Sequence, residues 1–216
     1  MSERITDIVE RVHGFMESDV YPLEKHTNGK PFYTISPLLE EKRARVKELG
    51  LWTPQVPEEW GGLGLTLSEF GQISEVMGRS PYGLFIFNCN APDTGNMETL
   101  VLYGTDAQKV RWLEPLLEGK IRSAFAMTEP DVASSDATNI RCSIKRDGGD
   151  YVINGRKWFT TGAMRESCEI LIVMGKTDPD NPNRHAQQSM VMVPKNTPGV
   201  KIVRHVKTLG YDDAPF

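Results

Sequence analysis

The sequence predicts an α+β protein, with an all-helical domain over residues 1–120 followed by an antiparallel, β-barrel-like domain over residues 121–216. Before Lys120, apolar residues recur every three or four positions, as on one face of a helix. After Lys120, short runs of strand type alternate with Gly, Asn and Asp turn signals. Short strands joined by tight turns favour an antiparallel sheet or barrel in the second half.

Five helical segments are predicted in the first half. The first has Ser2 as its N-cap and carries an apolar stripe at Ile5, Ile8, Val9, Val12, Phe15 and Met16. The second is expected to begin at Ser36-Pro37 and to end near Gly50, since serine caps helices and proline fits their first position.

Capping boxes and glycines delimit the other three helical segments. Thr66 with Glu69 and Thr105 with Gln108 each have the pattern in which two side chains satisfy the first backbone N–H groups. Between them, residues 94–103 are expected to be helical up to Gly104, and the last segment is expected to stop at Gly119.

The predicted strands are six short runs in the second half. They cover residues 123–127, 142–146, 151–153, 157–161, 169–175 and 189–194. Two turn signals separate some of them, Asp147-Gly148-Gly149 and Asn154-Gly155. Asn-Gly is a strong signal for a two-residue hairpin, so residues 151–153 and 157–161 are expected to pair.

Composition excludes several classes of function. The net charge of −4 offers no basic excess for binding nucleic acid through its phosphates. Three cysteines without CxxC spacing and four histidines without ligand spacing predict no disulfide framework and no metal site. No apolar run is long enough to span a membrane, and the first residues lack the apolar stretch of a secretory signal, so we expect none. We expect an intracellular protein, with cytoplasm, mitochondrion and peroxisome all compatible.

The glycines of Gly62-Leu63-Gly64 do not form a dinucleotide fingerprint. Leu67 stands where the third glycine belongs, and no apolar strand precedes them. A tight loop is the better interpretation.

Two later segments are candidate ligand-binding surfaces. In the first, residues 125–136, a strand enters a proline turn followed by hydroxyl and carboxylate side chains. Hydroxyls and strand-end N–H groups can donate to a heterocycle or a phosphate, but an ordinary turn rich in capping residues has the same composition. In the second, residues 154–162, strand periodicity would place Trp158 and Thr160 on one face, beside a planar cofactor. The alternative is a tryptophan in the core.

Taken together, these segments resemble the acyl-CoA dehydrogenase superfamily along nearly the whole chain. The helical part is similar through Pro54-Gln-Val-Pro-Glu-Glu-Trp-Gly-Gly-Leu-Gly64 and Tyr103-Gly-Thr-Asp-Ala-Gln-Lys109. The β part is similar through Thr128-Glu-Pro130, Ser134-Ser135-Asp136 and Asn154-Gly-Arg-Lys-Trp-Phe-Thr160. The order and spacing of these motifs match the family.

The resemblance implies FAD as the cofactor. Its site residues are expected to be Phe125, Met127, Thr128, Ser134, Ser135, Trp158, Phe159 and Thr160, with Trp158 on the isoalloxazine and Thr160 near its N5. Five residues precede Asp136 where the family usually has four, and both glycines are absent, as in the branch that in animals is often fused to a kinase-like domain. Either Ser134 or Ser135 therefore takes the family's serine role; we favour Ser135, which is also expected to bind substrate.

The reaction implied is α,β-dehydrogenation of acyl-CoA thioesters in fatty acid β-oxidation. A glutamate from a C-terminal four-helix domain removes the α-proton while a hydride leaves the β-carbon for the flavin. No segment resembles that domain, and residues 207–216 read as an element still in progress. We therefore expect no catalytic base in this chain, which would be inactive alone. Glu129, although a carboxylate in the motif, is structural in the family's pattern.

Partners also follow from the resemblance. They are an acyl-CoA substrate, an electron-transfer flavoprotein as acceptor, and further copies of the full-length parent in a dimer or tetramer. An acyl-CoA oxidase or a nitroalkane-oxidase-like flavoenzyme shares the scaffold, and a non-catalytic binding module is an alternative from another class.

Overall fold

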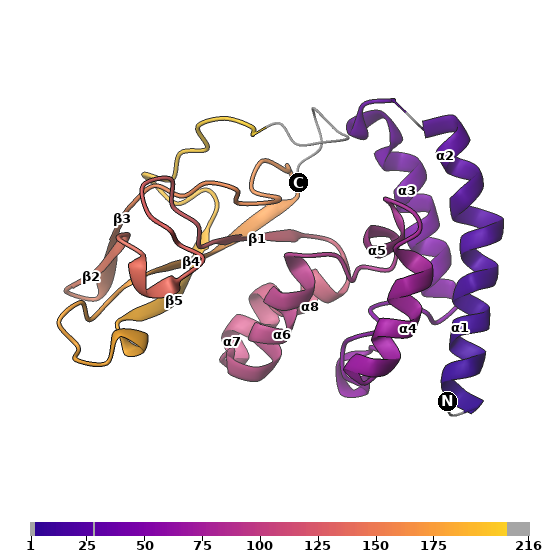
Figure 1. Ribbon diagram of the computed structural model, residues 1–216, viewed down its shortest axis with the longest axis horizontal. Coiled ribbons are helices and arrows are strands. Elements are labelled where there is room, and N and C mark those ends of the chain that lie inside the picture. The colour runs from indigo at the N-terminus through magenta and orange to yellow at the C-terminus, as the bar shows by residue number, and fades with distance from the viewer. Residues whose placement is uncertain (1–2, 28, 207–216) are drawn as a thin grey trace. The chain divides into compact units, whose positions relative to one another are not determined.

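The computed structural model describes residues 3–27 and 29–206, which form two compact units that divide between Gly119 and Lys120 (Figure 1). The first unit is helical and the second contains a β-sheet, which confirms the predicted fold class. The expected cap at Ser2 and the expectation for residues 207–216 lie outside the described residues.

The helical unit contains eight α-helices among its described residues: α1 (Glu3–Phe15), α2 (Tyr21–Thr27), α3 (Phe32–Glu48), α4 (Leu67–Met77), α5 (Gly83–Ile86), α6 (Asp93–Tyr103), α7 (Asp106–Gln108) and α8 (Glu114–Leu117). Two π-helical turns, Met16–Val20 and Lys109–Leu113, continue the helices before them, and a 3-10 turn covers Glu58–Trp60. Over the described part of the chain, no helix has both the length and the apolar character needed to cross a membrane.

The predicted apolar stripe of α1 is buried. Ile5, Ile8, Val12 and Phe15 all face the core, and the Phe15 ring meets Phe87 edge-on with 5.5 Å between centroids. Edge-to-face rings are a favourable arrangement for aromatic pairs. The stripe therefore packs α1 into the core of this unit.

Both predicted capping boxes are present. The Thr66 side chain accepts from Glu69 N–H, and the Glu69 carboxylate accepts from Thr66 N–H at the start of α4. Thr105 and Gln108 form the same pair of bonds at α7. These local contacts fix where both helices begin.

The predicted start of α3 is wrong. The helix begins at Phe32, four residues before Ser36, and contains Pro37 in its interior. An interior proline removes one helical hydrogen bond. Burial of Phe32 and Ile35 in the first turns stabilises the longer helix despite that loss.

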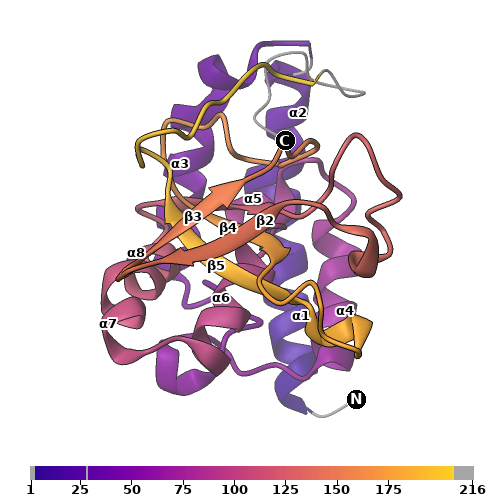
Figure 2. The same cartoon turned by 90° about the vertical axis from the view of Figure 1, so that its left-hand side faces the viewer.

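Among its described residues, the β unit has five strands: β1 (Arg122–Ala126), β2 (Ser143–Asp147), β3 (Asp150–Asn154), β4 (Cys168–Lys176) and β5 (Gln188–Pro194). The order is β1-β4-β2-β3, with β5 paired to β4. Figure 2 turns the β unit towards the viewer and labels β2 to β5. Because β1 and β2 run parallel to β4, the sheet is mixed and not wholly antiparallel as predicted. The β2–β3 and β4–β5 pairs are antiparallel.

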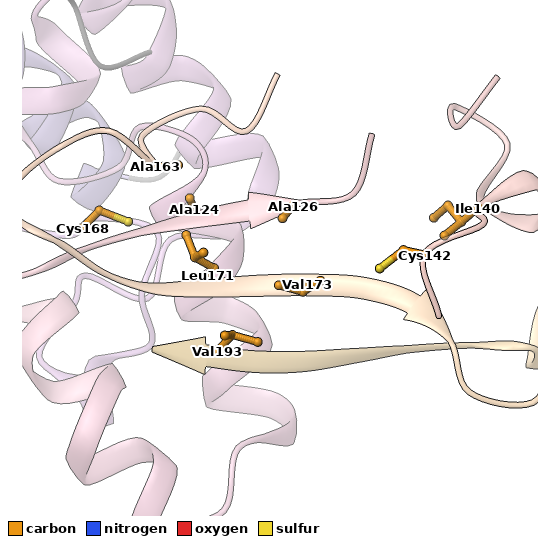
Figure 3. Close-up of a cluster of buried hydrophobic side chains, with 9 residues drawn as sticks. All are labelled: Ala124, Ala126, Ile140, Cys142, Ala163, Cys168, Leu171, Val173 and Val193. Atoms are coloured by element: carbon orange, nitrogen blue, oxygen red, sulfur yellow. The ribbon is translucent and has the colours of Figure 1, made fainter. Parts of the chain in front are cut away.

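Small and branched side chains fill the core of this unit. Figure 3 shows Ala124 and Ala126 of β1 beside Leu171 and Val173 of β4, with Val193 of β5 next to them. β4 is buried on both faces through most of its length. Pairing with the buried central strand β4 fixes the position of β1. The first candidate segment, residues 125–136, begins at the end of β1.

Two hairpin predictions have opposite outcomes. Gly148 and Gly149 form the two-residue turn between β2 and β3, where Asp147 pairs with Asp150 and Gly148 takes a φ of 59°. The hairpin predicted at Asn154-Gly155 is wrong, because β3 ends at Asn154 and residues 155–160 form no strand.

Candidate functional site

The end of β1 and the irregular segment after β3 lie side by side. Trp158 N–H donates to the Thr128 carbonyl oxygen at 3.0 Å. Lys157 Nζ donates to the Met127 carbonyl oxygen, thirty positions away in sequence, at 2.8 Å. The structure therefore brings together Met127, Thr128 and Trp158 from the two candidate segments.

Gly155 allows this segment to approach the start of β2. A Cβ added at Gly155 would lie 2.6 Å from the Cys142 Cβ and 2.9 Å from its Cα, closer than real side chains come. The residue that follows β3 must therefore be glycine for the chain to take this course.

Trp158 and Phe159 form an exposed aromatic pair. Their ring centroids are 4.6 Å apart with an angle of 49° between the planes, and 38% and 53% of the two residues is accessible. Phe159 has a φ of 49°, an unusual value for a bulky residue, and this turn disrupts the alternation expected for a strand. The predicted strand over 157–161 is therefore wrong, and Trp158 is not a core residue.

Two threonines adjoin this aromatic pair along the backbone, Thr160 next in sequence and Thr128 through its carbonyl bond to Trp158 N–H. Thr128 and Thr160 are both half-buried, and within the described part of the chain neither hydroxyl has a hydrogen-bond partner. Phe125, in β1, is also half-buried. Flat aromatic surface, unpaired hydroxyls and strand-end backbone are the groups that suit a planar heterocycle with ring nitrogens and carbonyls.

The Glu129 carboxylate is fully engaged inside the protein. It accepts from the N–H groups of Arg141 at 2.7 Å and Cys142 at 2.8 Å, and from Lys157 Nζ at 2.8 Å. Burial raises the pKa of Glu129, but the bonds from Lys157 and the two N–H groups outweigh that effect, so the pKa lies below its ordinary value. A general base works best with a pKa near the operating pH. Glu129 is thus a structural tie and a poor candidate base.

The two adjacent serines differ in environment. Ser134 is buried, and its hydroxyl accepts from Glu129 N–H at 2.8 Å. Ser135 is exposed and lines a pocket of about 360 Å³. Of the two serines, only Ser135 therefore presents its side chain to solvent in a hollow.

Polar groups from distant segments line the same pocket. Gln188 Nε2 is buried there and has no partner among the described residues. The Thr138 hydroxyl and N–H bond to Asp136 and lower the pKa of its carboxyl, while Arg184 donates to the Thr138 hydroxyl at 2.8 Å. His185 completes a polar side, and the apolar lining comes from Met174 and Met190.

Sequence reasoning assigned no role to Lys157, Gln188 or His185. Lys157 lies within the motif of residues 154–160, but none of its neighbours in sequence indicates the bond to Glu129. Gln188 and His185 reach the pocket through the β4–β5 pairing and the 3-10 turn Arg184–Ala186, which are tertiary features. Groups of three or more His, Cys, Asp or Glu suited to a metal ion are absent from residues 3–27 and 29–206.

Comparison with known families covers nearly the whole chain. Residues 2–120 match the acyl-CoA dehydrogenase N-terminal domain, and residues 124–216 match the acyl-CoA dehydrogenase middle domain. The chain belongs to the acyl-CoA dehydrogenase family. The resemblance inferred from the motifs is confirmed.

Relatives of the family align over almost all of this chain. It is 49% identical to mouse "Acyl-CoA dehydrogenase family member 10", covering 100% of this chain and 21% of that protein. It is 48% identical to "Probable acyl-CoA dehydrogenase FadE2" of Mycobacterium tuberculosis, covering 99% of this chain and 53% of the relative. The chain thus spans about half or less of the length of these curated relatives.

Solved structures are also similar to this chain in fold. "Structure of a putative acyl-CoA dehydrogenase from Mycobacterium abscessus" matches with a TM-score of 0.92 and 44% identity, covering 99% of this chain and 56% of that chain. "PigA with FAD and proline" matches with a TM-score of 0.71 and 25% identity, covering 92% of this chain and 50% of that chain.

Proposed function

We propose that this chain carries part of the FAD and acyl-CoA binding surface of an acyl-CoA dehydrogenase that oxidises the α,β bond of a thioester. The supporting observation is the hydrogen bond from Trp158 N–H to the Thr128 carbonyl, which unites the two motifs predicted to contact the flavin. Family membership and a structural neighbour solved with FAD support the choice of cofactor.

The residues available fit an isoalloxazine ring. Trp158 and Phe159 offer exposed aromatic surface, and Thr128 and Thr160 offer hydroxyls without partners in the described chain. Phe125 and Met127 would line the same surface. When bound, FAD would supply the capacity to accept two electrons, while these residues would orient the ring and exclude water on one side.

Ser135 and its pocket are proposed to hold a polar part of the acyl-CoA. The Gln188 amide is an unpaired buried donor that a ligand acceptor would satisfy, and leaving such a donor unpaired is costly. Ser134 is proposed to support the site indirectly, since its hydroxyl already bonds to Glu129.

The catalytic base is proposed to come from outside this chain, because the carboxylate within the motif, Glu129, already accepts three hydrogen bonds. Transfer of electrons to an electron-transfer flavoprotein and assembly of the full-length parent into a homo-oligomer belong to the same proposal. Loss of a general base typically reduces the rate by a factor of about 10²–10⁴. Acyl-CoA added to the FAD-loaded chain should therefore leave the flavin oxidised, and rapid bleaching would contradict this part.

The first test is a titration of the chain with FAD, followed by flavin fluorescence. Trp158→Ala should raise the Kd about tenfold, because stacking on an aromatic ring is worth roughly 1–3 kcal/mol. Tyr151→Ala is the matched control, since Tyr151 is an exposed aromatic residue of the same unit. Equal Kd values for wild type and Trp158→Ala would contradict the proposed flavin surface.

A further inference from the structure

Lys157 forms a buried clip between the two segments of the proposed flavin surface. Its Nζ lies 2.8 Å from both the Met127 carbonyl oxygen and Glu129 Oε1. The side chains of Lys157 and Glu129 are only 11% and 6% exposed. A pair this sheltered is weakly screened by solvent and salt, so its geometry is well defined.

The same carboxylate also holds the approach to β2. Its two oxygens accept from the N–H groups of Arg141 and Cys142, just before that strand begins. Three separate stretches of the β unit, at residues 127–129, 141–142 and 157, therefore meet at Glu129. Movement of Lys157 would alter how the first and third of these stretches face each other.

The aromatic residues depend on this clip because they lie outside the sheet ladder. Residues 155–160 have no strand partner within the described chain, unlike β4, which pairs along its length with β1 and β5. Trp158 N–H to Thr128 and Lys157 Nζ to Met127 fasten the segment to the end of β1. Lys157 directly precedes Trp158 in the sequence, and Trp158 carries the indole that Lys157 would orient.

We propose that Lys157 is a positioning residue, which sets the placement of Trp158 and Phe159 against the end of β1 and thereby the affinity and environment of the flavin. This inference rests on the proposed function. Lys157 itself is not proposed to touch the cofactor. Its role differs from general stabilisation, because loss of the clip should loosen residues 155–160 while leaving β4 and β5 protected.

The ligand-free test is amide hydrogen exchange on the chain with Lys157→Met, a change that keeps length but removes the charge. The Trp158 amide should exchange about tenfold faster or more, as expected when a hydrogen-bonded charge is lost nearby. Lys195→Met is the matched control, since Lys195 Nζ also joins distant segments by donating to the Arg165 carbonyl oxygen. Exchange at Trp158 that is unchanged in Lys157→Met would overturn the proposal.

The second readout is FAD binding, measured by flavin fluorescence. Lys157→Met should raise the Kd about tenfold and shift the emission of bound flavin, Lys157→Arg should restore part of both, and Lys195→Met should match wild type. If wild type binds no FAD, the proposed function fails, whereas the exchange experiment still decides the role of Lys157. Wild-type affinity and emission in Lys157→Met would overturn the proposal even if that variant were less stable.

A measurement on the unmodified chain covers the case in which Lys157→Met does not fold. Acidification that protonates Glu129 should release the clip, so Trp158 exchange, corrected for its intrinsic pH dependence, should accelerate before exchange in β4. Simultaneous loss of protection at Trp158 and in β4 would overturn the proposal.

Discussion

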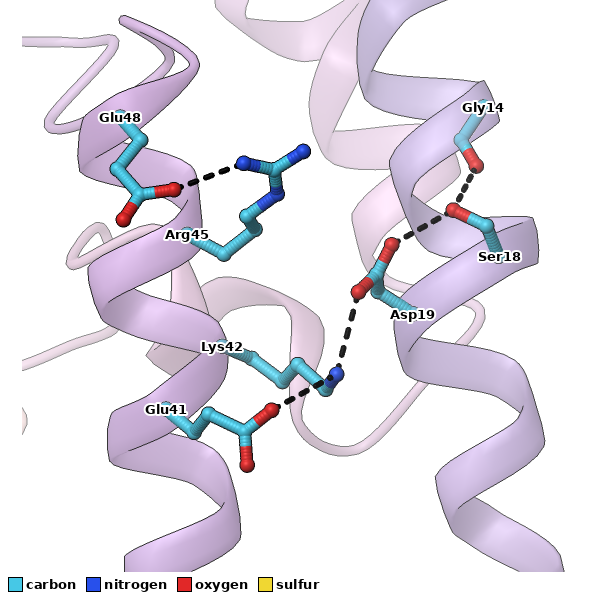
Figure 4. Close-up of polar contacts among 7 residues, drawn as sticks. All are labelled: Gly14, Ser18, Asp19, Glu41, Lys42, Arg45 and Glu48. Atoms are coloured by element: carbon cyan, nitrogen blue, oxygen red, sulfur yellow. Dashed lines mark hydrogen bonds and ion pairs between the residues drawn. The ribbon is translucent and has the colours of Figure 1, made fainter.

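Each unit contains an ion pair between a lysine and a carboxylate, and the two pairs differ in what they join. In the helical unit, Lys42 of α3 lies 3.1 Å from Asp19, whose other oxygen accepts from the Ser18 hydroxyl (Figure 4). The side chains of Lys42 and Asp19 are 19% and 27% exposed. In the β unit, Lys157 and Glu129 are 2.8 Å apart and more deeply buried.

The elements behind each pair determine the consequence of losing it. Asp19 and Lys42 sit on helical turns whose backbone bonds exist without them. Lys157 sits on a segment without such a framework, and Glu129 also holds two backbone N–H groups. The helical pair therefore adjusts stability, whereas the pair in the β unit also shapes the candidate site.

The largest difference is expected from Glu129→Gln. This substitution leaves the buried Lys157 without a counter-charge, a loss that typically costs about 3–5 kcal/mol. The free energy of unfolding of the β unit should fall by about that amount, as measured by chemical denaturation, and amide exchange at Trp158 should accelerate more than exchange in β4. Glu169→Gln, at an exposed position of the same unit, should change it by less than about 0.5 kcal/mol. Equal effects from the two variants would show that Glu129 contributes no more to stability than an exposed glutamate of the same unit.

A smaller effect is expected from Lys42→Met. A partly exposed pair contributes up to about 1 kcal/mol, so the free energy of unfolding of the helical unit should fall by no more than that. Exchange at Trp158 should stay at the wild-type rate. Lys25→Met, at an exposed position of α2, is the control and should have little effect on either measurement. Loss of Trp158 protection in Lys42→Met would show that the pair in the helical unit also shapes the site.

The smallest effect is a difference in acid sensitivity. Burial raises the pKa of both Asp19 and Glu129, but hydrogen bonds lower each pKa by more than burial raises it. The bonds to Asp19 come from Ser18 and Lys42, and those to Glu129 come from Lys157 and the N–H groups of Arg141 and Cys142. Each carboxylate therefore contributes stability above its ordinary pKa, 3.8 for Asp19 and 4.5 for Glu129, and that stability is lost as the pH falls through the lowered value.

Replacing Lys157 should increase the difference between the two units in the pH at which acid destabilises them. In Lys157→Met the pKa of Glu129 should rise, so the β unit should lose stability at a higher pH than in wild type, while the helical unit should not change. Circular dichroism during acid titration, with exchange in α4 and β4 as local probes, measures the two transitions. An unchanged transition in the β unit would mean that Lys157 does little to keep Glu129 ionised.

Sequence reasoning succeeded where the decisive contacts are local. The capping boxes at Thr66 and Thr105 involve residues three apart, and the Gly148-Gly149 turn depends on its own backbone. The family motifs also identified segments that meet in space. These features need no information from elsewhere in the chain.

It failed where distant residues decide the local structure. Asn154-Gly155 has a hairpin sequence, but Lys157 and Trp158 bond to the end of β1, so no strand can form opposite β3. Pro37 suggested a helix start, but buried Phe32 extends the helix in front of it. The Gln188 donor in the pocket has no sequence signature at all.

The close approach of Gly155 to Cys142 carries a consequence for variation within this motif. Even one methyl group at position 155 would collide with the backbone that presents Cys142 N–H to Glu129. Gly155 carries no charge and no reactive group, yet its size restricts the geometry of the site as strictly as the charged Lys157 and Glu129 do. Variants that preserve every polar residue of residues 154–160 but enlarge Gly155 should therefore lose the local shape of the candidate site.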